Sequence, residues 1–369
     1  MWQQIRALVS KELLAVWKDR RSRFVLIGPP IIQLMVFGYA ATYDLQDVPV
    51  AFYLEDGGRD ARELASRFAG SPVFRTVAWL EHESDIARVI EGRDAALVVH
   101  IGQDFSRRLR VARPARVQLV VDGRNSNTAL ILVGYANAIL RDFNLDWLRR
   151  QGEPMPPGNL VVRAWFNPNL HSRWFIVPGI VALLTLVVTL VVTALSVARE
   201  RELGTFDQLL VTPLRPVQIL VGKSLGPLLI GIVEGTVIVL VAVLWFGVPL
   251  LGSIVMLYLA MVMFLLAVIG VGLMISSLVR TQQQAILGAF LFLVPAIILS
   301  GFATPIANMT DTVQLITWLN PMRYFLVIVR GLFLEGLPPA LVVHQLWPLA
   351  LIAVASLSVA GWLFRNRLG

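Results

Sequence analysis

The stretch "ARERELGTFDQLLVTPLRP" at residues 198–216 contains six charged residues, one glycine and two prolines. It lies between two almost entirely apolar stretches, residues 174–197 and residues 225–246. A helix of about 20 apolar residues crosses a hydrocarbon core about 30 Å thick, and both stretches are long enough to do so. The sequence therefore predicts a membrane protein in which a short polar elbow, residues 198–216, joins two spans.

The overall composition agrees with this prediction. Of the 369 residues 56% are hydrophobic and 15% are charged, and the mean hydropathy is +0.70. A soluble domain has about 45–50% apolar and about 25% charged residues. The chain has no cysteine, which excludes disulfides, thiolate metal sites and a cysteine nucleophile. Its four histidines are far apart in sequence, which disfavours a histidine metal cluster.

Six apolar runs are long enough to span the membrane. None of them alternates with a period of two residues, so they are expected to be helices rather than barrel strands. The fold class predicted is an α-helical membrane protein with six transmembrane helices. The predicted spans are residues 24–42, 174–198, 225–247, 254–279, 285–303 and 346–364.

Lysine and arginine in the short flanks set the orientation. The first 23 residues contain six of them, whereas the turn at residues 248–253 contains none. Both termini and the polar elbow are therefore predicted to be cytoplasmic, and the first span to be a signal anchor that is not cleaved. Because the basic excess lies at the membrane flanks, anionic lipid explains the net charge of +8 and a nucleic-acid partner is rejected.

Residues 1–23 are predicted to form an amphipathic helix at the cytoplasmic interface. Their apolar side chains, including Trp2 and Trp17, lie near one helical face, and Lys11 and Lys18 lie near another. This separation is typical of a helix that lies in the membrane interface.

Residues 43–173 are predicted to form an inserted extracytoplasmic α/β domain. With 17 arginines and 16 acidic residues, this segment is nearly neutral. Segments with strand patterns alternate with helical patterns about ten residues long, which is typical of a small α/β unit. The expected strands are residues 48–56, 72–79, 94–101 and 115–123, and residues 159–168 are a candidate for a further strand. The expected helices are residues 59–70, 83–93, 103–110 and 126–150.

Two glycine motifs resemble nucleotide-binding loops and fail the test of spacing. "VGKS" at residues 221–224 would need a glycine at position 217, which is Val217. "GVG" at residues 270–272 lacks its third glycine and lies in an apolar span, so helix packing explains it better. The pairs 222/226 and 231/235 have the small-xxx-small spacing that lets helices approach closely.

Glu234 lies near the middle of the third predicted span. An ionisable group at that depth costs on the order of 2.5 kcal/mol or more, so it needs a polar interior, a partner or a proton. Two interpretations stay open: a group in the substrate pathway, or a packing residue that is protonated or hydrogen-bonded.

The segment 304–336 follows the fifth span and is too interrupted to cross. Arg323 and Arg330 are seven residues apart on one helical face, and we take them as candidates for the substrate pathway. One interpretation is a set of re-entrant helices in the outer leaflet, which is tolerated where protein covers their ends. The alternative is an ordinary amphipathic surface helix.

The polar elbow begins as a continuation of the second span. Gly204 allows a bend, and Pro213 and Pro216 end the helical pattern. The segment 199–213 then forms a compact helix with charged and apolar sides, which a cytoplasmic protein could grip. The alternative is a solvated helical hairpin.

These residues resemble a known family. "ERELGTFDQLLVTPLRPVQILVGK" at residues 200–223 is similar to the signature region of type 2 ABC-transporter permeases, the ABC-2 membrane family. The similarity continues through "WFNPNLHSRWFIVPG", "ISSLVRTQQQA", "LSGFATPIANM" and "NPMRYFLVIVRGLFLEG", and so covers essentially the whole chain. The large outer domain is typical of the multidrug-exporter-like subgroup. One departure is Thr310, in the outer turn, where the family usually has proline.

The resemblance implies a function for the elbow and a set of partners. It implies cytoplasmic ABC ATPase subunits that bind ATP and Mg, no cofactor on this chain, and a dimer with a second copy or a paralogue. Relatives with this outer domain typically engage a periplasmic membrane-fusion adaptor and an outer-membrane channel. The residues implied in coupling to the ATPase are Arg199, Glu200, Arg201, Glu202, Gly204, Thr205, Asp207 and Gln208.

The hypothesis is a permease subunit, without its own nucleotide site, of an ATP-driven exporter in the bacterial inner membrane. Its expected cargo is hydrophobic or amphipathic, drug-like or lipid-like. An alternative is a membrane sensor whose outer domain binds a ligand, although no cytoplasmic segment is long enough for an output domain. An intramembrane enzyme is a third, which the absence of paired catalytic groups within the spans weakens.

Overall fold

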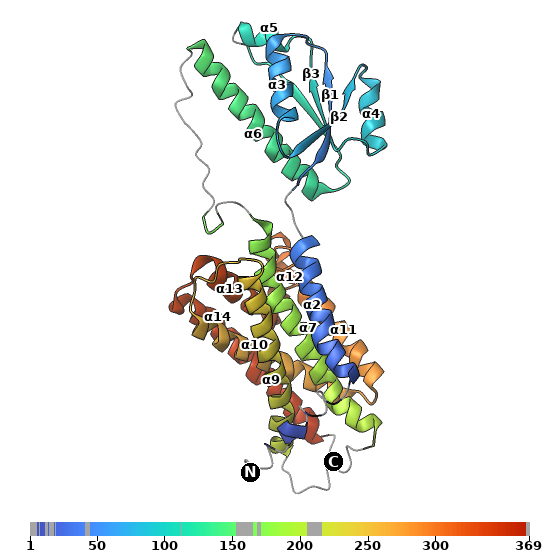
Figure 1. Cartoon of the computed structure of the whole chain (residues 1–369). Helices are drawn as coiled ribbons and strands as arrows, with labels where there is room; N and C mark the ends of the chain where they lie inside the picture. The colour runs from blue at the N-terminus through green and yellow to red at the C-terminus, as the bar shows by residue number, and fades with distance from the viewer. Residues whose placement is uncertain are drawn as a thin grey trace. The chain divides into compact units, whose positions relative to one another are not determined.

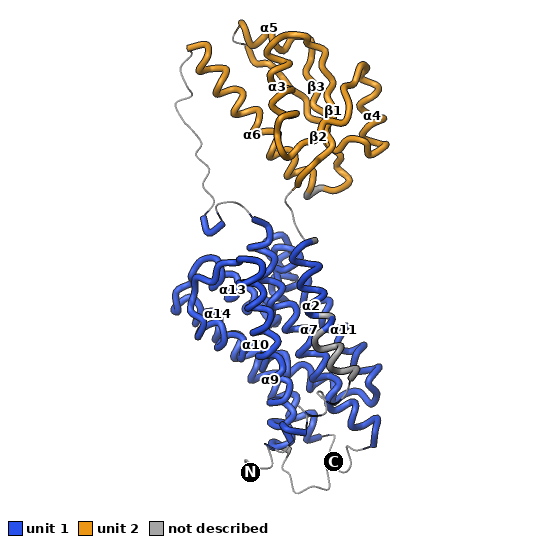
Figure 2. The backbone as a smooth tube through the Cα atoms, viewed as in Figure 1, with its two compact units in different colours: residues 1–41, 164–369 blue, residues 42–163 orange. Residues whose placement is uncertain are grey.

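The computed structural model describes residues 6, 8–11, 14, 18, 20–40, 45–111, 113–152, 165–167, 171–204 and 216–366. The chain forms two compact units, coloured separately in Figure 2. Residues 1–41 and 164–369 make up a helical unit, and residues 42–163 make up an α/β unit.

The helical unit consists of long apolar helices and a series of short ones (Figure 1). The long helices are α2 (Arg20–Ala40), α7 (Ser172–Glu202), α9 (Pro216–Leu244), α10 (Ile254–Leu278), α11 (Gln282–Ile298) and α14 (Pro339–Asn366). The short ones are η1 (Ile306–Asn308), α12 (Asp311–Ile316), η2 (Thr317–Leu319), α13 (Pro321–Arg330) and η3 (Gly331–Glu335). The described residues among 6–18 are helical too, and α2 begins before the predicted start of the first span at residue 24.

Within the described residues, four helices are long and apolar enough to cross a membrane. They are Ser172–Glu202, Val217–Leu244, Ile254–Leu278 and Pro339–Asn366. They contain the second and sixth predicted spans and all but the last residues of the third and fourth. The first and fifth predicted spans fall largely on α2 and α11, whose apolar helical parts are shorter, Pro30–Tyr39 and Gln282–Ile298. The mostly helical membrane fold is therefore confirmed, while the count of six spans stays a prediction.

Helix α7 is the central element of the helical unit. It is apolar almost all round, which is the pattern of a helix enclosed by others. It packs against α2, α9, α10, α11 and α13, and α10 packs in turn against α14. Aromatic stacking fastens α13 to α10, with the rings of Phe264 and Phe325 4.3 Å apart.

The α/β unit has a four-stranded sheet in the order β2-β1-β3-β4. Its strands are β1 (Val48–Leu54), β2 (Phe74–Leu80), β3 (Leu97–Ile101) and β4 (Val117–Val121). The first three are parallel and β4 is antiparallel to β3. The helices are α3 (Arg59–Ala69), α4 (Ser84–Glu91), α5 (Phe105–Arg110) and α6 (Ser126–Gln151), close to the predicted ranges.

The two faces of this sheet are covered by different helices. Alternate residues of a strand point to opposite faces, so Phe52 packs in the core with α3, α5 and α6 while Ala51 packs in the core with α4. Figure 1 shows α4 on one side of the sheet and α3 and α6 on the other. Most of the candidate strand 159–168 lies outside the described residues, and the part that is described, residues 165–167, is not a strand.

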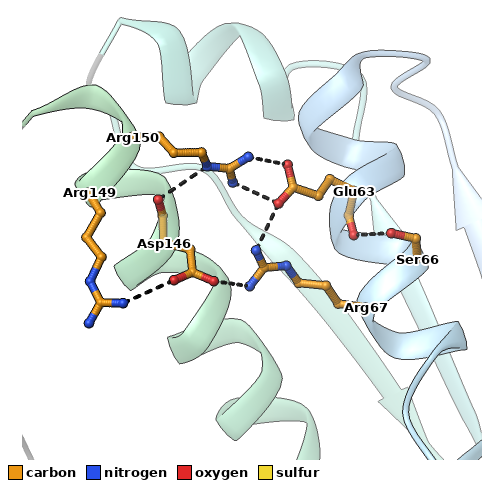
Figure 3. Close-up of polar contacts among 6 residues, drawn as sticks. All are labelled: Glu63, Ser66, Arg67, Asp146, Arg149 and Arg150. Carbon is orange, nitrogen blue, oxygen red and sulfur yellow. Dashed lines mark hydrogen bonds and ion pairs between the residues drawn. The ribbon is translucent and has the colours of Figure 1, made fainter.

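Helices α3 and α6 are joined by an ion-pair network (Figure 3). Arg150 donates two hydrogen bonds to the Glu63 carboxylate, both 2.7 Å long, and Arg67 bridges Glu63 to Asp146 with two bonds of 2.9 Å. The hydrogen bonds from Arg150 hold the pKa of Glu63 below its usual range, although partial burial opposes them. The network therefore belongs to the packing of α3 against α6.

The segment 304–336 folds into short helices, as predicted. Asn320 caps α13 by accepting a hydrogen bond from the Met322 N–H (3.1 Å), and Pro321 is the first residue of that helix. Gly336 ends η3 in the left-handed conformation, with φ of 61°. The depth of these helices in a membrane stays a prediction.

Candidate functional site

The polar elbow starts as a continuation of α7, because α7 runs without a break through the end of the predicted span to Glu202. Leu203 and Gly204 then close the helix by donating hydrogen bonds to the carbonyls of Arg199 (3.0 Å) and Arg201 (3.1 Å). Gly204 has φ of +66°, the left-handed conformation that glycine adopts readily after a helix. The helix therefore ends at Gly204, the residue at which the sequence predicts a bend, and the chain directly after it lies outside the described residues.

Glu200 joins three segments that are far apart in sequence. Its carboxylate forms an ion pair of 2.7 Å with Lys223 of α9 and one of 2.8 Å with Lys11 of the N-terminal helix. Lys223 is only 1% exposed, and its Nζ also donates to Ser196 Oγ at 3.3 Å. A buried amine needs such partners, because an unpaired charge in an apolar interior is costly.

Arg201 and Glu202 bind the ends of two other helices. The Arg201 guanidinium donates to the carbonyls of Ser277 (2.9 Å) and Val279 (3.1 Å) at the end of α10. Glu202 Oε2 accepts from the backbone N–H of Gln282 (2.8 Å), the first residue of α11. The carbonyl end of a helix favours a cation and the N–H end an anion, so each charge complements the helix end it meets.

The backbone of α7 is also hydrogen-bonded to α10 just before these charged residues. The N–H groups of Val197 and Ala198 both lie 3.1 Å from Ser276 Oγ. The end of α7 is thereby tied to α9, α10, α11 and the N-terminal helix. We call the group formed by Glu200, Arg201, Glu202, Lys223 and Gln282 the elbow cluster.

The N-terminal helix also packs on α9 beside this cluster. A methyl group added at Gly222 would lie 2.7 Å from the Leu8 side chain, so the two helices are in close contact there. Gly222 and Lys223 belong to the "VGKS" stretch, whose lysine thus makes an ion pair with Glu200. The absence of a side chain at position 222 is what admits Leu8.

Five of the eight residues implied in coupling are described: Arg199 and Glu200 to Glu202 at the end of α7, and Gly204 after it. The remaining three, Thr205, Asp207 and Gln208, lie outside the described residues, as does the rest of the elbow up to Arg215.

The three pathway candidates do not join the elbow cluster, and they do not form one site with each other. Glu234 is buried in α9, and neither carboxylate oxygen has a hydrogen-bond partner. Arg323 bonds to its own surroundings, the Thr317 hydroxyl and the Gln314 carbonyl, and lies over the Trp318 ring.

Arg330 is held mainly by an aromatic ring. Its guanidinium lies 3.9 Å from the centre of the Phe175 ring in α7, and Nη1 lies 3.5 Å from the Gly301 carbonyl. Its Nε and Nη2 have no hydrogen-bond partner. Of the two arginines, only Arg330 has buried donors that no described residue bonds.

The sequence did not predict the contacts that three residues make with the end of α7: Lys11, Lys223 and Gln282. The sequence analysis placed Lys11 on the polar face of the N-terminal helix, Lys223 in the "VGKS" stretch and Gln282 in a family motif. Lys223 is 23 residues from Glu200 and Gln282 is 80 residues from Glu202, so no local periodicity connects them. A lysine about two turns inside α9, directly before a long apolar run, was the one available signal.

The comparison with known proteins agrees with the helical membrane fold. Residues 21–362 match the family described as ABC-2 family transporter protein. Over 368 residues, covering 100% of both chains, the sequence is 39% identical to the probable multidrug ABC transporter permease YbhR of Escherichia coli (strain K12). It is 33% identical to the probable multidrug ABC transporter permease YbhS of the same organism over 356 residues, 95% of this chain and 93% of YbhS.

A third relative is the inner membrane transport permease YhhJ of the same strain, 30% identical over 97% of this chain and 96% of YhhJ. The chain belongs to the ABC-2 family of transporter proteins. It is a multi-pass membrane chain of the permease type, and membership implies partnership with ABC ATPase subunits. The resemblance seen in the motifs is confirmed.

Proposed function

We propose that this chain is the transmembrane subunit of an ATP-driven exporter that moves hydrophobic or amphipathic compounds out of the cytoplasm or the inner membrane. The names of YbhR and YbhS, both probable multidrug ABC transporter permeases, support a drug-like cargo. Family membership disfavours the alternative of a sensor.

In this proposal the chain crosses the bacterial inner membrane six times, α2 and α11 included, with both termini in the cytoplasm. The α/β unit lies outside the membrane on the periplasmic side. Separate ATPase subunits bind ATP and Mg, and this chain binds no cofactor. It pairs with a second copy or a paralogue, and the α/β unit engages a membrane-fusion adaptor and an outer-membrane channel.

The observation that carries the proposal is the elbow cluster. Charged side chains at the end of α7 contact the start of α9, the end of α10 and the start of α11. A force applied by an ATPase at the elbow would therefore move these helix ends together. Because α7 is a single helix from Ser172 to Glu202, it would transmit the displacement across the membrane.

The test is a substitution that weakens one of these contacts and keeps the size of the side chain. Glu202→Gln weakens the bond from Glu202 to the start of α11, since a neutral amide accepts less strongly than a carboxylate. We expect ATPase stimulation and ATP-driven transport by the reconstituted complex to fall about fivefold or more, the size of a typical coupling free energy. Membrane insertion and yield should be unchanged.

Glu335→Gln is the matched control, because Glu335 is an exposed glutamate of the same unit and lies outside the elbow cluster. It should leave both activities as in the wild type. Equal transport by the Glu202→Gln variant and the control would contradict the role of the elbow. A wild-type complex with no ATP-driven transport of any hydrophobic compound would contradict the proposed function as a whole.

A further inference from the structure

A polar row runs along the buried face of α7. Thr185, Thr189 and Thr193 follow at four-residue spacing and are completely buried. Thr185 and Thr193 donate their hydroxyl groups to backbone carbonyls one turn earlier, Val181 and Thr189. The Thr189 hydroxyl has no hydrogen-bond partner. Buried hydroxyls without a partner are rare, so Thr189 marks a place where an acceptor or donor is missing.

Two glycines of α9 lie against the threonines of this row. A methyl group added at Gly231 would lie 2.8 Å from Thr189 Oγ1, and one added at Gly235 would lie 3.2 Å from Thr185 Cγ2. The two helices therefore approach closely at these glycines, and we call this contact the seam.

Glu234 lies on the same turn of α9, between these two glycines. It is only 8% exposed, and both of its carboxylate oxygens lack a partner. A carboxyl group in an apolar helix bundle is stable as the neutral acid or beside a cation. In the closed seam no cationic side chain contacts it among the described residues.

The walls of the seam are apolar. Methyl groups added at Gly231 and Gly235 would also meet Leu265 and Met261 of α10, at 2.6 Å and 2.7 Å. One carboxyl group and one hydroxyl cannot replace the six or more oxygen ligands that a hydrated metal ion requires. A cation with dispersed charge and an apolar body fits this lining better.

The seam is connected to the elbow cluster by α7 itself. Thr189 and Glu200 are eleven residues apart on that helix, which corresponds to about 16 Å along its axis. A displacement applied at the elbow would therefore reach the level of the seam through α7.

We infer that Glu234 is the recognition group for cationic amphipathic substrates, which bind between α7 and α9 when the seam opens. The positive group of the substrate lies against the Glu234 carboxylate with Thr189 beside it, and its apolar body lies against α10. The carboxyl proton passes to water as the cation arrives, so the bound pair is neutral overall. This inference rests on the proposed function and adds the charge class of the cargo.

The experiment measures binding to the purified full-length chain in lipid nanodiscs, without the ATPase. The probes have nearly the same shape and different charge: tetraphenylphosphonium, a permanent cation, and tetraphenylborate, an anion. Wild type should bind the cation more tightly than the anion. Glu234→Gln should weaken binding of the cation about tenfold or more, since it removes a charged partner. Thr189→Val should weaken it about fivefold, the effect of one neutral hydrogen bond.

Two further variants separate recognition from folding. Glu234→Asp keeps the carboxylate and should retain most of the affinity, whereas Glu335→Gln removes an exposed carboxylate and should change nothing. All variants are compared for helicity and for monodispersity on a sizing column. If Glu234→Gln binds tetraphenylphosphonium as wild type does, or if wild type does not prefer the cation, the inference is wrong.

The result is distinguishable from a failure of the proposed function. Binding is measured on the chain alone, and transport is measured on the complex with its ATPase. Suppose that the Glu234→Gln variant binds tetraphenylphosphonium as the wild type does, and that the complex still exports a neutral hydrophobic probe. The proposed function then stands, and only this inference is wrong. A complex with no ATP-driven transport loses the proposed function.

Discussion

At the scale of single residues, Lys223 is the side chain on which the polar elbow depends most. Its amine is 1% exposed and lies 2.7 Å from the Glu200 carboxylate. Lys11, the other cation on Glu200, has a side chain that is 54% exposed. Solvent screens the exposed pair and not the buried one, so the two ion pairs should differ in their effect on stability.

The prediction is a double-mutant comparison at this pair. Glu200→Gln leaves the Lys223 charge buried without its counter-ion, and should lower the free energy of unfolding by about 3 kcal/mol or more. Adding Lys223→Gln removes the stranded charge and should restore part of the loss. Lys11→Gln removes only the exposed partner and should cost about 1 kcal/mol or less.

The measurement is thermal unfolding of the detergent-purified chain, followed by intrinsic fluorescence. Additive losses in the Glu200→Gln and Lys223→Gln variants would mean that the two side chains do not stabilise each other in solution. In that event the ion pair would be no part of the force path through the elbow.

At the scale of elements, the end of α7 is set by one backbone conformation. Gly204 has φ of +66°, and a methyl group added there would meet nothing within 4 Å. Glycine is therefore favoured at position 204 by the backbone conformation and not by a lack of space for a side chain. An L-residue in this conformation costs roughly 1–2 kcal/mol, and asparagine tolerates it better than alanine.

This difference predicts an order of activity among substitutions at the bend. Gly204→Ala should favour further helix at the end of α7 and reduce ATPase stimulation, whereas Gly204→Asn should retain most of it. With a strain of about 1 kcal/mol, the expected reduction for alanine is about fivefold. The readout is the ATPase rate of the reconstituted complex, and equal rates for both variants would show that the bend angle is not what the ATPase requires.

At the scale of the whole molecule, topology is the feature that most needs a direct measurement. The positive charge at the flanks predicts that the elbow is cytoplasmic and that the α/β unit is outside. The chain contains no cysteine, so a single introduced thiol can be labelled without background. Ser84 in α4 and Leu203 at the end of α7 are both exposed.

We expect Ser84→Cys to react with a membrane-impermeant maleimide added to intact spheroplasts. Leu203→Cys should react only after the membrane is permeabilised, because the label reaches only thiols on its own side. Labelling of Leu203→Cys from outside, with Ser84→Cys protected, would invert the orientation. In that orientation the elbow would lie on the opposite side of the membrane from a cytoplasmic ATPase and could not contact it.

The sequence by itself determined the class of fold and the order of its parts. Runs of about 20 apolar residues specify membrane helices because lipid leaves backbone groups no other partner. Alternation of strand and helix patterns in residues 48–150 predicted the strands and helices that the structure describes in the α/β unit, since these periods follow from local backbone geometry. The continuation of α7 into the elbow and the left-handed glycine that ends it were readable for the same reason.

Only the tertiary structure decided which side chains meet. The pairing of Glu200 with Lys223, the contact of Glu202 with α11, and the seam between Thr189 and Gly231 each join segments that are dozens of residues apart or lie on separate helices. The physical reason is that a helix determines which of its residues share a face, whereas the packing of several helices determines what that face contacts. The two interpretations of Glu234 that the sequence left open could be weighed only when it was known that the carboxylate is buried and that no described residue bonds it.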